Sequence, residues 1–239
     1  MLPSQLDQLL ESTASTRNSE ERSPLDVIVV SGEPCPCSVI QKFKSTPFFS
    51  TTRLFNFYGQ TETVGDICYS NLSDDTIVEG TVPVGSLLPG VSLELSEGTN
   101  EVVVTHGSFA NGYYNSSEAI RPFRTGDEGF YCGSSLYIRG RIGDVQKING
   151  ILTSPTEVES RFQSMFGSSP CAATILGGAS YVLTEQTDVR DCFSRQKMRD
   201  AQVPWNLIPK GAFWIHSLPR TNSGKVQRGQ VKDIVKSRL

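Results

Sequence analysis

The chain contains 239 residues, of which 37% are hydrophobic and 20% are charged, and its formal net charge is -3. This length provides one domain or two small ones with an adequate core, and the weakly negative charge argues against binding to the phosphate backbone of nucleic acids. The longest aliphatic run, Val27 to Val30, is far shorter than the ~20 apolar residues that span a bilayer, and the first residues do not resemble a secretory signal. We therefore expect a cytoplasmic protein with no nucleic-acid partner and no membrane span.

The first section, residues 1–80, has the pattern of an α/β layer. Leu2, Leu6, Leu9 and Leu10 fall on one face of a short helix. The polar run from Ser12 to Ser23 then indicates a loop. Asp26 to Ser31 is apolar on both faces, which predicts a buried strand of a parallel sheet, and a second strand from Arg53 to Phe57 ends at Gly59.

The second section, residues 81–143, consists of short predicted strands separated by turns. Val91 to Leu95 alternates between apolar and polar residues, and Val102 to Thr105 continues the pattern after a turn. Phe130 to Cys132 and Leu136 to Ile138 are paired in the same way. We expect a small antiparallel sheet or β-barrel.

The third section, residues 144–239, predicts a compact α+β lobe. Ser154 and Glu157 form a capping-box signature with Pro155 in the first turn, and Gly167 ends the predicted helix. Further elements are predicted over Ala172 to Leu176, over Tyr181 to Thr184, and over a last helix that carries Val231, Ile234 and Val235.

The cysteines and histidines show no pattern typical of a metal site. Cys35 and Cys37 flank a proline, and the other four cysteines are scattered. We expect six free thiols, as is usual in a reducing compartment. The two histidines, His106 and His216, are far apart in sequence, and we predict structural roles for both.

Chemistry-bearing side chains gather where these predicted elements join. Asn56 to Glu62 brings an aromatic ring, a flexible turn, a hydroxyl and a carboxylate directly after a strand, which suits a base, a phosphate and a hard cation. An ordinary strand-to-helix turn is the alternative. Arg124 to Asp127 places a carboxylate on a predicted tight turn, where it could accept both hydroxyls of a ribose, although most such turns are only turns.

Two clusters of glycines and cations follow. Gly140, Arg141, Lys147 and Gly150 form the first, and the run from Leu218 to Lys225 forms the second. Glycines beside cations allow the backbone to approach a ligand closely, but each cluster alone could be a solvated basic loop. The run Leu176 to Ser180 matches the core pattern around the modified serine of carrier proteins, yet its two glycines favour a hairpin turn, and we predict an unmodified Ser180.

The order of the motifs resembles the superfamily of acyl-CoA synthetases, luciferases and nonribosomal peptide synthetase adenylation domains. Five motifs occur in that family's sequence order: Gly32-Glu33, Tyr58 to Glu62, Arg124 to Asp127, Gly140-Arg141 and Leu218 to Lys225. The resemblance covers nearly the whole chain. It implies that residues 1–143 are the C-terminal part of the large AMP-binding domain and that residues 144–239 are its small mobile lobe.

The resemblance also implies roles for individual residues. Three act in catalysis: Thr61 binds phosphate, Glu62 binds magnesium, and Lys225 completes the adenylation site. The implied nucleotide- and thiol-binding positions are Gly32, Glu33, Asn56, Phe57, Tyr58, Gly59, Asp127, Ile138, Arg141 and Gly150. In this set Tyr58 stacks on adenine, Asp127 holds the ribose hydroxyls, Ile138 is a second adenine wall, Arg141 helps to fix the nucleotide and Gly150 lines the thiol tunnel.

Several positions depart from the family pattern. The glycine- and hydroxyl-rich phosphate loop and the upstream wall of the carboxylate pocket are not found in the 239 residues, so we expect an incomplete, N-terminally truncated chain. The hinge position holds Gly143 followed by Asp144, where the family usually has aspartate or lysine, and a glycine still allows pivoting. Leu152 stands where an arginine is common.

The function implied by the resemblance is ATP- and Mg²⁺-dependent activation of a small carboxylate or amino acid through an acyl- or aminoacyl-adenylate. The acyl group then passes to the thiol of coenzyme A or of a phosphopantetheine arm, with a carrier-protein domain as a further partner. Adenylation domains that activate amino acids or β-alanine are the nearest type. The alternative is a catalytically inactive fragment or pseudoenzyme with residual nucleotide binding. The sequence does not indicate which carboxylate is used.

Overall fold

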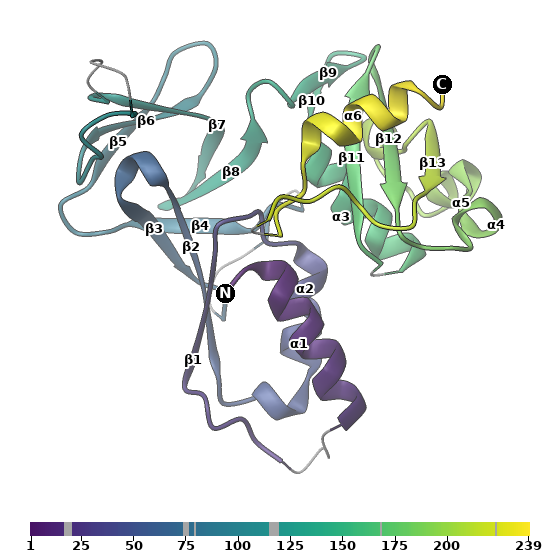
Figure 1. The fold of residues 1–239 in the computed structure, drawn as a ribbon, viewed down its shortest axis with the longest axis horizontal. Helices are drawn as coiled ribbons and strands as arrows, with labels where there is room; N and C mark the ends of the chain where they lie inside the picture. Colours follow the sequence, from purple (N-terminus) through teal and green to yellow (C-terminus); the bar gives the residue numbers. More distant parts are fainter. Residues whose placement is uncertain (17–20, 74–76, 79, 115–119, 168, 223) are drawn as a thin grey trace. The chain divides into compact units, whose positions relative to one another are not determined.

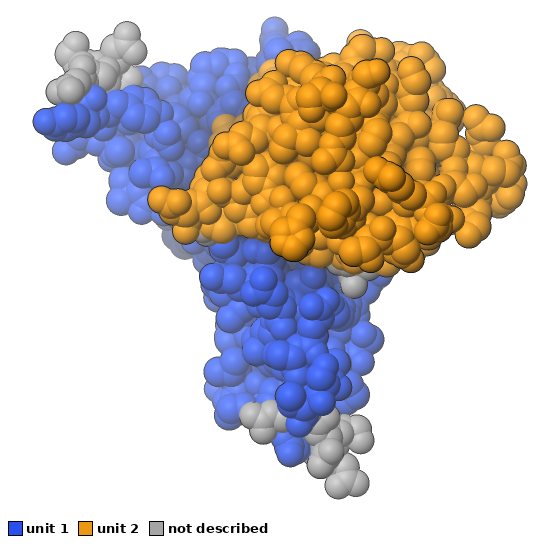
Figure 2. Space-filling view, turned by 45° about the vertical axis from the view of Figure 1, so that its right-hand side comes forward, with its two compact units in different colours: residues 1–138 blue, residues 139–239 orange. Residues whose placement is uncertain are grey.

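The computed structural model describes residues 1–16, 21–73, 77–78, 80–114, 120–167, 169–222 and 224–239. These residues form two compact units, Met1–Ile138 and Arg139–Leu239, which Figure 2 distinguishes by colour. Each unit is described by itself. The predicted pivot at Gly143 and Asp144 lies within the second unit, and its role as a pivot stays a prediction. Within the described residues, no helix combines the length and apolar character needed to cross a membrane.

The helices of the first unit are α1 (Pro3–Thr16), α2 (Cys37–Ser45) and the short 3-10 helix η1 (Pro47–Phe49). The expected loop from Ser12 was wrong in part, because α1 continues to Thr16. Its buried face includes Thr13, one turn after Leu10. The Ser12 and Thr16 hydroxyls donate to backbone carbonyls within the helix, which satisfies these polar residues without unwinding it.

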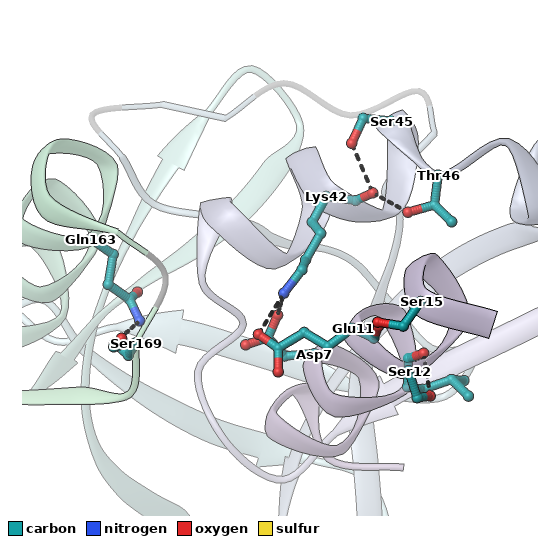
Figure 3. Close-up of polar contacts among 10 residues, drawn as sticks. Asp7, Glu11, Ser12, Ser15, Lys42, Ser45, Thr46, Gln163 and Ser169 are labelled. Carbon is teal, nitrogen blue, oxygen red and sulfur yellow. Dashed lines mark hydrogen bonds and ion pairs between the residues drawn. The ribbon is translucent and has the colours of Figure 1, made fainter. Parts of the chain in front are cut away.

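One cation connects α1 to α2. The Lys42 ammonium donates to the carboxylates of Asp7 at 2.8 Å and Glu11 at 3.0 Å (Figure 3). Leu6 and Leu10 of α1 pack in one core cluster with residues of α2 and of strand β1. The two helices therefore cover one face of the sheet in this region.

The first unit contains one continuous mixed sheet, with strand order β1-β2-β3-β4-β8-β7-β6-β5 (Figure 1). Its strands are β1 (Val27–Ser31), β2 (Arg53–Gln60), β3 (Gly65–Asn71), β4 (Pro83–Leu87), β5 (Ser92–Leu95), β6 (Glu101–His106), β7 (Phe123–Cys132) and β8 (Ser135–Arg141). The boundary between the two units falls within β8, after Ile138. β1 and β2 pair in parallel, as predicted. The pairs β2·β3, β3·β4, β4·β8, β5·β6 and β6·β7 are antiparallel.

The predicted separation into an α/β layer and a barrel was therefore wrong in one respect. β4 pairs with both β3 and β8 and so joins the two parts into one sheet. Gly85 makes this possible, because a Cβ atom there would lie 2.2 Å from the backbone oxygen of Tyr69. Nothing in the local sequence pattern around Gly85 indicates which strands will meet there.

The second unit begins with the hairpin of β9 (Gln146–Ile148) and β10 (Ile151–Thr153), followed by α3 (Pro155–Phe166). A three-stranded sheet has the order β11-β12-β13, with β12 antiparallel to β11 and parallel to β13. The remaining elements are β11 (Cys171–Leu176), β12 (Ala179–Thr184), α4 (Val189–Cys192), α5 (Arg195–Asp200), η3 (Trp205–Leu207), β13 (Gly211–Trp214) and α6 (Arg228–Lys236).

Helices α3 and α6 pack on opposite faces of this sheet. Val182 of β12 packs in a cluster with Phe162 of α3, whereas the neighbouring Leu183 packs in a cluster with Val231 of α6. This alternation follows from the two-residue period of a strand. The α+β lobe predicted for this part of the sequence is confirmed.

Two local predictions in the second unit are also confirmed. Ser154 and Glu157 form the capping box of α3, with the Ser154 N–H 2.8 Å from the Glu157 carboxylate and the Glu157 N–H 3.1 Å from the Ser154 hydroxyl. Gly177 and Gly178, at φ 55° and 72°, form the turn between β11 and β12. Ser180 is buried in β12. All six cysteines are free, as expected.

Candidate functional site

The predicted base- and phosphate-binding segment forms a tight reversal between two strands. β2 runs through Gln60, the single 3-10 turn η2 spans Thr61–Thr63, and β3 begins at Gly65. The Thr63 hydroxyl closes the turn, because it accepts the Gln60 N–H at 3.1 Å and donates to the Gly65 carbonyl at 2.7 Å. The strand-to-helix alternative was wrong, since no α-helix follows β2 here. The turn leaves Thr61 exposed and Glu62 half-buried.

Gly59 has a structural reason to be glycine. A Cβ atom at this position would lie 2.1 Å from the Gly65 carbonyl oxygen and 2.4 Å from the Asp66 Cα atom. The ladder between β2 and β3 shifts register at this point, between Tyr58 and Gly59. The close approach at Gly59 is therefore made by strand β3, and the implied role of Gly59 in nucleotide binding stays a prediction.

The tight turn predicted for Arg124 to Asp127 was wrong, because these residues lie inside β7. The ladder between β6 and β7 is irregular here, and Gly126 has φ 73°. The Thr125 hydroxyl donates to the Val102 carbonyl at 2.9 Å. The carboxylate of buried Glu101 accepts the Gly126 N–H at 3.0 Å and forms an ion pair with Arg124.

This bulge brings Asp127 to two residues of β2. The Tyr58 hydroxyl and the Gln60 amide nitrogen each donate to Oδ2 of Asp127, both at 2.7 Å. Asp127 is only 6% exposed, and a buried carboxylate needs such donors. Burial first and the neighbouring Asp127 second raise the pKa of Tyr58 well above its ordinary value. Tyr58 therefore stays protonated and keeps its donor at neutral pH.

The predicted metal ligand, Glu62, accepts hydrogen bonds from the loop between β6 and β7. The Tyr113 hydroxyl donates to Oε1 of Glu62 at 2.6 Å, and the Ala110 N–H donates to its carbonyl at 2.8 Å. The hydrogen bond to Glu62 is the main cause that raises the pKa of Tyr113. The described residues contain no group of three or more His, Cys, Asp or Glu suited to a metal ion. Glu62 fits a magnesium ion that takes its other ligands from phosphates and water.

Three predicted binding residues have clear packing partners. The Asn56 amide donates to the Pro83 carbonyl at 2.9 Å in a buried position, so it connects β2 to β4. The Phe57 ring lies 6.0 Å from the Tyr69 ring, centroid to centroid. Ile138 packs against the same apolar cluster as Tyr58. Tyr58 and Ile138 thus pack against one apolar cluster, and their roles as adenine walls stay predictions.

Gly32 and Glu33 follow β1 directly. Gly32 is exposed and has a φ of 90°, a backbone conformation that glycine adopts without strain. The Glu33 carboxylate accepts the Ser4 N–H at 2.6 Å, near the start of α1. An acidic group at this end of a helix is stabilising. Glu33 therefore helps to anchor α1, a structural role that was not predicted from the sequence.

The remaining predicted site residues belong to the second unit or to the end of β8. Arg141 ends β8 with an exposed side chain, and its carbonyl accepts the N–H groups of Asp144 and Val145 at 2.9 Å each. Asn149 and Gly150, at φ 46° and 88°, form the two-residue turn between β9 and β10. Both Arg141 and Gly150 therefore lie at turns that leave them accessible.

Lys225 lies on a closed loop before α6. The Thr221 N–H donates to the Lys225 carbonyl at 2.8 Å, and the Lys225 N–H donates to the Thr221 hydroxyl at 3.1 Å. The Arg220 guanidinium donates to the Gly224 carbonyl at 2.9 Å. The neighbouring Ser223 lies outside the described residues. The loop holds the backbone of Lys225 while its side chain is exposed.

Sequence reasoning missed the residues that hold the site together. Gln60 was quoted in a motif without a role, and Glu101 and Tyr113 were not considered. Glu101 precedes Asp127 by many residues and meets its segment through strand pairing. The amide of Gln60, beside Tyr58 in the same strand, is the one local signal that could have been used.

The α/β fold and the order of these motifs match the class of adenylate-forming enzymes. The AMP-binding enzyme family model matches residues 1–128, more than half of the chain. The chain therefore belongs to the AMP-binding enzyme family.

Similar proteins agree with this assignment. The chain is 26% identical to the D-alanine–D-alanyl carrier protein ligase of Staphylococcus aureus (strain bovine RF122 / ET3-1) over 241 residues, which cover 92% of the chain and 49% of that ligase. It is similar in fold to the anthranilate CoA ligase AuaEII in complex with anthranoyl-AMP (TM-score 0.77, 19% identity, 100% of this chain and 50% of that one). It is also similar to the O-succinylbenzoate coenzyme A synthetase of Bacillus subtilis in complex with ATP and magnesium ion (TM-score 0.73, 21% identity, 98% and 50%). The chain thus spans about half the length of the relatives it matches.

Proposed function

We propose that this chain carries nucleotide-binding and adenylation residues of an ATP-dependent enzyme that activates a carboxylate as an acyl- or aminoacyl-adenylate. The observation that carries this proposal is the network of Tyr58, Gln60 and Asp127, in which an aromatic residue and a buried carboxylate are bonded directly. A nucleoside presents its base and its ribose hydroxyls side by side. An aromatic face next to a carboxylate matches that pair.

Tyr58, Asp127, Ile138 and the turn after Gln60 then each have a defined task. Tyr58 stacks on adenine, Ile138 forms a second wall, and Asp127 accepts from the ribose hydroxyls. The turn after Gln60 presents the hydroxyl of Thr61 and the carboxylate of Glu62 toward the phosphates. Magnesium, when bound at Glu62, would neutralise phosphate charge as pyrophosphate leaves.

The second unit supplies the group that distinguishes an adenylating enzyme from a simple nucleotide-binding protein. Lys225, on its closed loop, would stabilise the charge that accumulates between the carboxylate and the α-phosphate. A pivot at Gly143 and Asp144 would then withdraw Lys225 and admit a thiol past Gly150, while Arg141 helps to fix the nucleotide. The exposed side chain of Lys225 on an anchored backbone supports this role.

The relatives' names support a proposal for the substrate class. The ligase from Staphylococcus aureus is named for D-alanine and a D-alanyl carrier protein, and AuaEII is named for anthranilate and coenzyme A. We propose a small carboxylate or amino acid as the acyl donor. The acceptor is the thiol of coenzyme A or of a phosphopantetheine arm on a carrier protein.

The first test is nucleotide binding by the 239-residue chain, measured by isothermal titration calorimetry with Mg²⁺-ATP and with AMP. Asp127→Ala should weaken binding of both by about tenfold or more, because a hydrogen-bonded charged partner of the ribose is lost. Glu94→Ala, on β5, is the control and should leave binding unchanged. Failure of the wild-type chain to bind either nucleotide would refute the proposal.

Amino-acid-dependent exchange of pyrophosphate into ATP separates catalysis from binding alone. Nucleotide binding without exchange, across a panel of carboxylates and amino acids, would favour the alternative of a nucleotide-binding protein that is catalytically inactive. Exchange that requires one carboxylate would support the adenylating function and identify its substrate.

A further inference from the structure

Gln60 has no task in the function proposed above, yet it contacts both parts of the candidate nucleotide site. Its amide nitrogen lies 2.7 Å from Oδ2 of Asp127 and 3.1 Å from the Thr125 carbonyl. Its backbone N–H donates to the Thr63 hydroxyl, and Gln60 and Thr63 form a capping box around the turn Thr61–Thr63. One residue thus joins the buried carboxylate of β7 to the turn that carries Thr61 and Glu62.

The chemistry of the site requires a neutral donor at this position. Asp127 is buried, and a buried carboxylate that loses a donor is destabilised and less well oriented. A hydrocarbon at position 60 would remove this donor from Oδ2 and keep the bond from Tyr58. A carboxylate at position 60 would place a second negative charge within hydrogen-bond distance of the first. Glutamine meets both requirements.

We propose that Gln60 is a positioning residue that fixes the carboxylate of Asp127 relative to the turn of Thr61 and Glu62. It does so through its side-chain amide on one side and its backbone N–H on the other. The ribose contact and the phosphate contact of a nucleotide are then set by one residue. This inference rests on the proposed nucleotide site.

The substitution Gln60→Glu provides a readout that a merely structural role would not give. Two carboxyl groups 2.7 Å apart share a proton well and repel each other when both are ionised, so the pKa of the pair is raised. AMP binding should then be close to the wild-type level at about pH 5.5 and fall by about tenfold as the pH rises to about 8. The wild-type profile, measured in parallel, accounts for the titration of AMP itself.

Other titratable groups near the pair do not account for such a profile. The turn after position 60 carries Glu62, and the strands β2, β3, β6 and β7 carry the other charged and titratable residues of this region. They are Arg53 and Tyr58 on β2, Asp66, Cys68 and Tyr69 on β3, Glu101 and His106 on β6, and Arg124, Asp127, Glu128, Tyr131 and Cys132 on β7. Burial raises the pKa of Cys68 to about 12 and that of Tyr58 well above its ordinary value, so neither ionises in this range. Glu101 is ion-paired with Arg124. These groups are also present in the wild-type chain, whose profile is subtracted.

A matched control exists in the second unit. The Gln196 amide lies 2.8 Å from Oδ1 of Asp200, the same pairing at nearly the same distance, but on the exposed surface of α5. Gln196→Glu should leave the pH profile of AMP binding unchanged. Gln60→Met, which keeps the length of the side chain but lacks the donor, should weaken AMP binding by about tenfold at every pH, and should have no further effect when combined with Asp127→Ala.

The outcomes separate the inference from the function on which it rests. A wild-type chain that binds no AMP would overturn the nucleotide site, and Gln60 with it. A wild-type chain that binds AMP, with a Gln60→Glu profile parallel to wild type, would overturn the positioning role alone. If Gln60→Glu does not fold, as judged by circular dichroism, Gln60→Met decides the question, and wild-type affinity in that variant would refute the inference.

Discussion

Removal of one hydroxyl, by Tyr58→Phe, tests whether the network around Asp127 contributes to the stability of the first unit. The ring and its apolar packing are kept, so the change is confined to the bond of 2.7 Å to Oδ2 of Asp127. A hydrogen bond to a charged group contributes ~1.5–3 kcal/mol. The second donor, Gln60, stays in place, so we expect a loss near the lower limit, about 1.5 kcal/mol in the free energy of unfolding.

The pH dependence of this loss has a defined sign. The pKa of Tyr58 is raised in the folded state, so the folded chain retains the phenol proton at a pH where the unfolded chain begins to release it. The associated stability is fully present below the unfolded pKa of about 10 and is lost as the pH rises through the folded value. The difference between wild type and Tyr58→Phe should therefore be constant from about pH 6 to 9 and shrink above about pH 10.

Urea unfolding followed by far-UV circular dichroism measures this difference. Hydrogen exchange of peptides from β2 and β7 assigns it to the first unit. The control is Tyr114→Phe, because Tyr114 is 96% exposed and a change there should stay within about 0.5 kcal/mol. Equal stability of Tyr58→Phe and wild type at pH 7, or a difference that does not decrease at alkaline pH, would refute the reasoning.

Two further predictions concern the second unit. In an enzyme form that catalyses both half-reactions, Lys225→Ala should slow adenylate formation by roughly 100- to 1,000-fold. It should nearly spare thioester formation from a synthetic acyl-adenylate. Equal losses in both assays would contradict the role of Lys225 in the first half-reaction alone. Arg228→Met should lower the stability of the second unit by ~3 kcal/mol, because it leaves the Glu159 carboxylate, with a side chain only 14% exposed, without its bidentate partner at 2.6 and 3.0 Å. Urea unfolding followed by tryptophan fluorescence is the assay, since both tryptophans lie in this unit, and Lys236→Ala, which removes an exposed ion pair to Asp233, should change little.

Local sequence signals predicted the features that depend on neighbouring residues. The capping box at Ser154 and Glu157 and the turn at Gly177 and Gly178 each involve groups a few residues apart, and both were found as predicted. The parallel pairing of β1 was also indicated, by a run that is apolar on both faces. Interactions between residues that are close in sequence can therefore be predicted from the local sequence pattern.

Features set by strand pairing could not be predicted in this way. The Arg124–Asp127 segment has the composition of a turn, but pairing with β6 holds it inside a strand, and Glu101 satisfies the Gly126 N–H. Likewise, the contact between Tyr58 and Asp127 depends on the register of β2 and β7, which share a sheet without being adjacent in it. A pattern read over a few residues carries no information about that register.

Some predicted site residues also make hydrogen bonds that hold the fold together. This decides which substitutions can test a contact with the nucleotide. Asn56 connects β2 to β4, and Glu33 anchors the start of α1, so a loss of nucleotide binding on changing either could arise from the fold alone. Asp127 accepts from Tyr58 and Gln60, which belong to the same proposed site. A change at Asp127 therefore alters contacts within the proposed site, and measuring the free energy of unfolding of the same variant separates a loss of the ribose contact from a loss of stability.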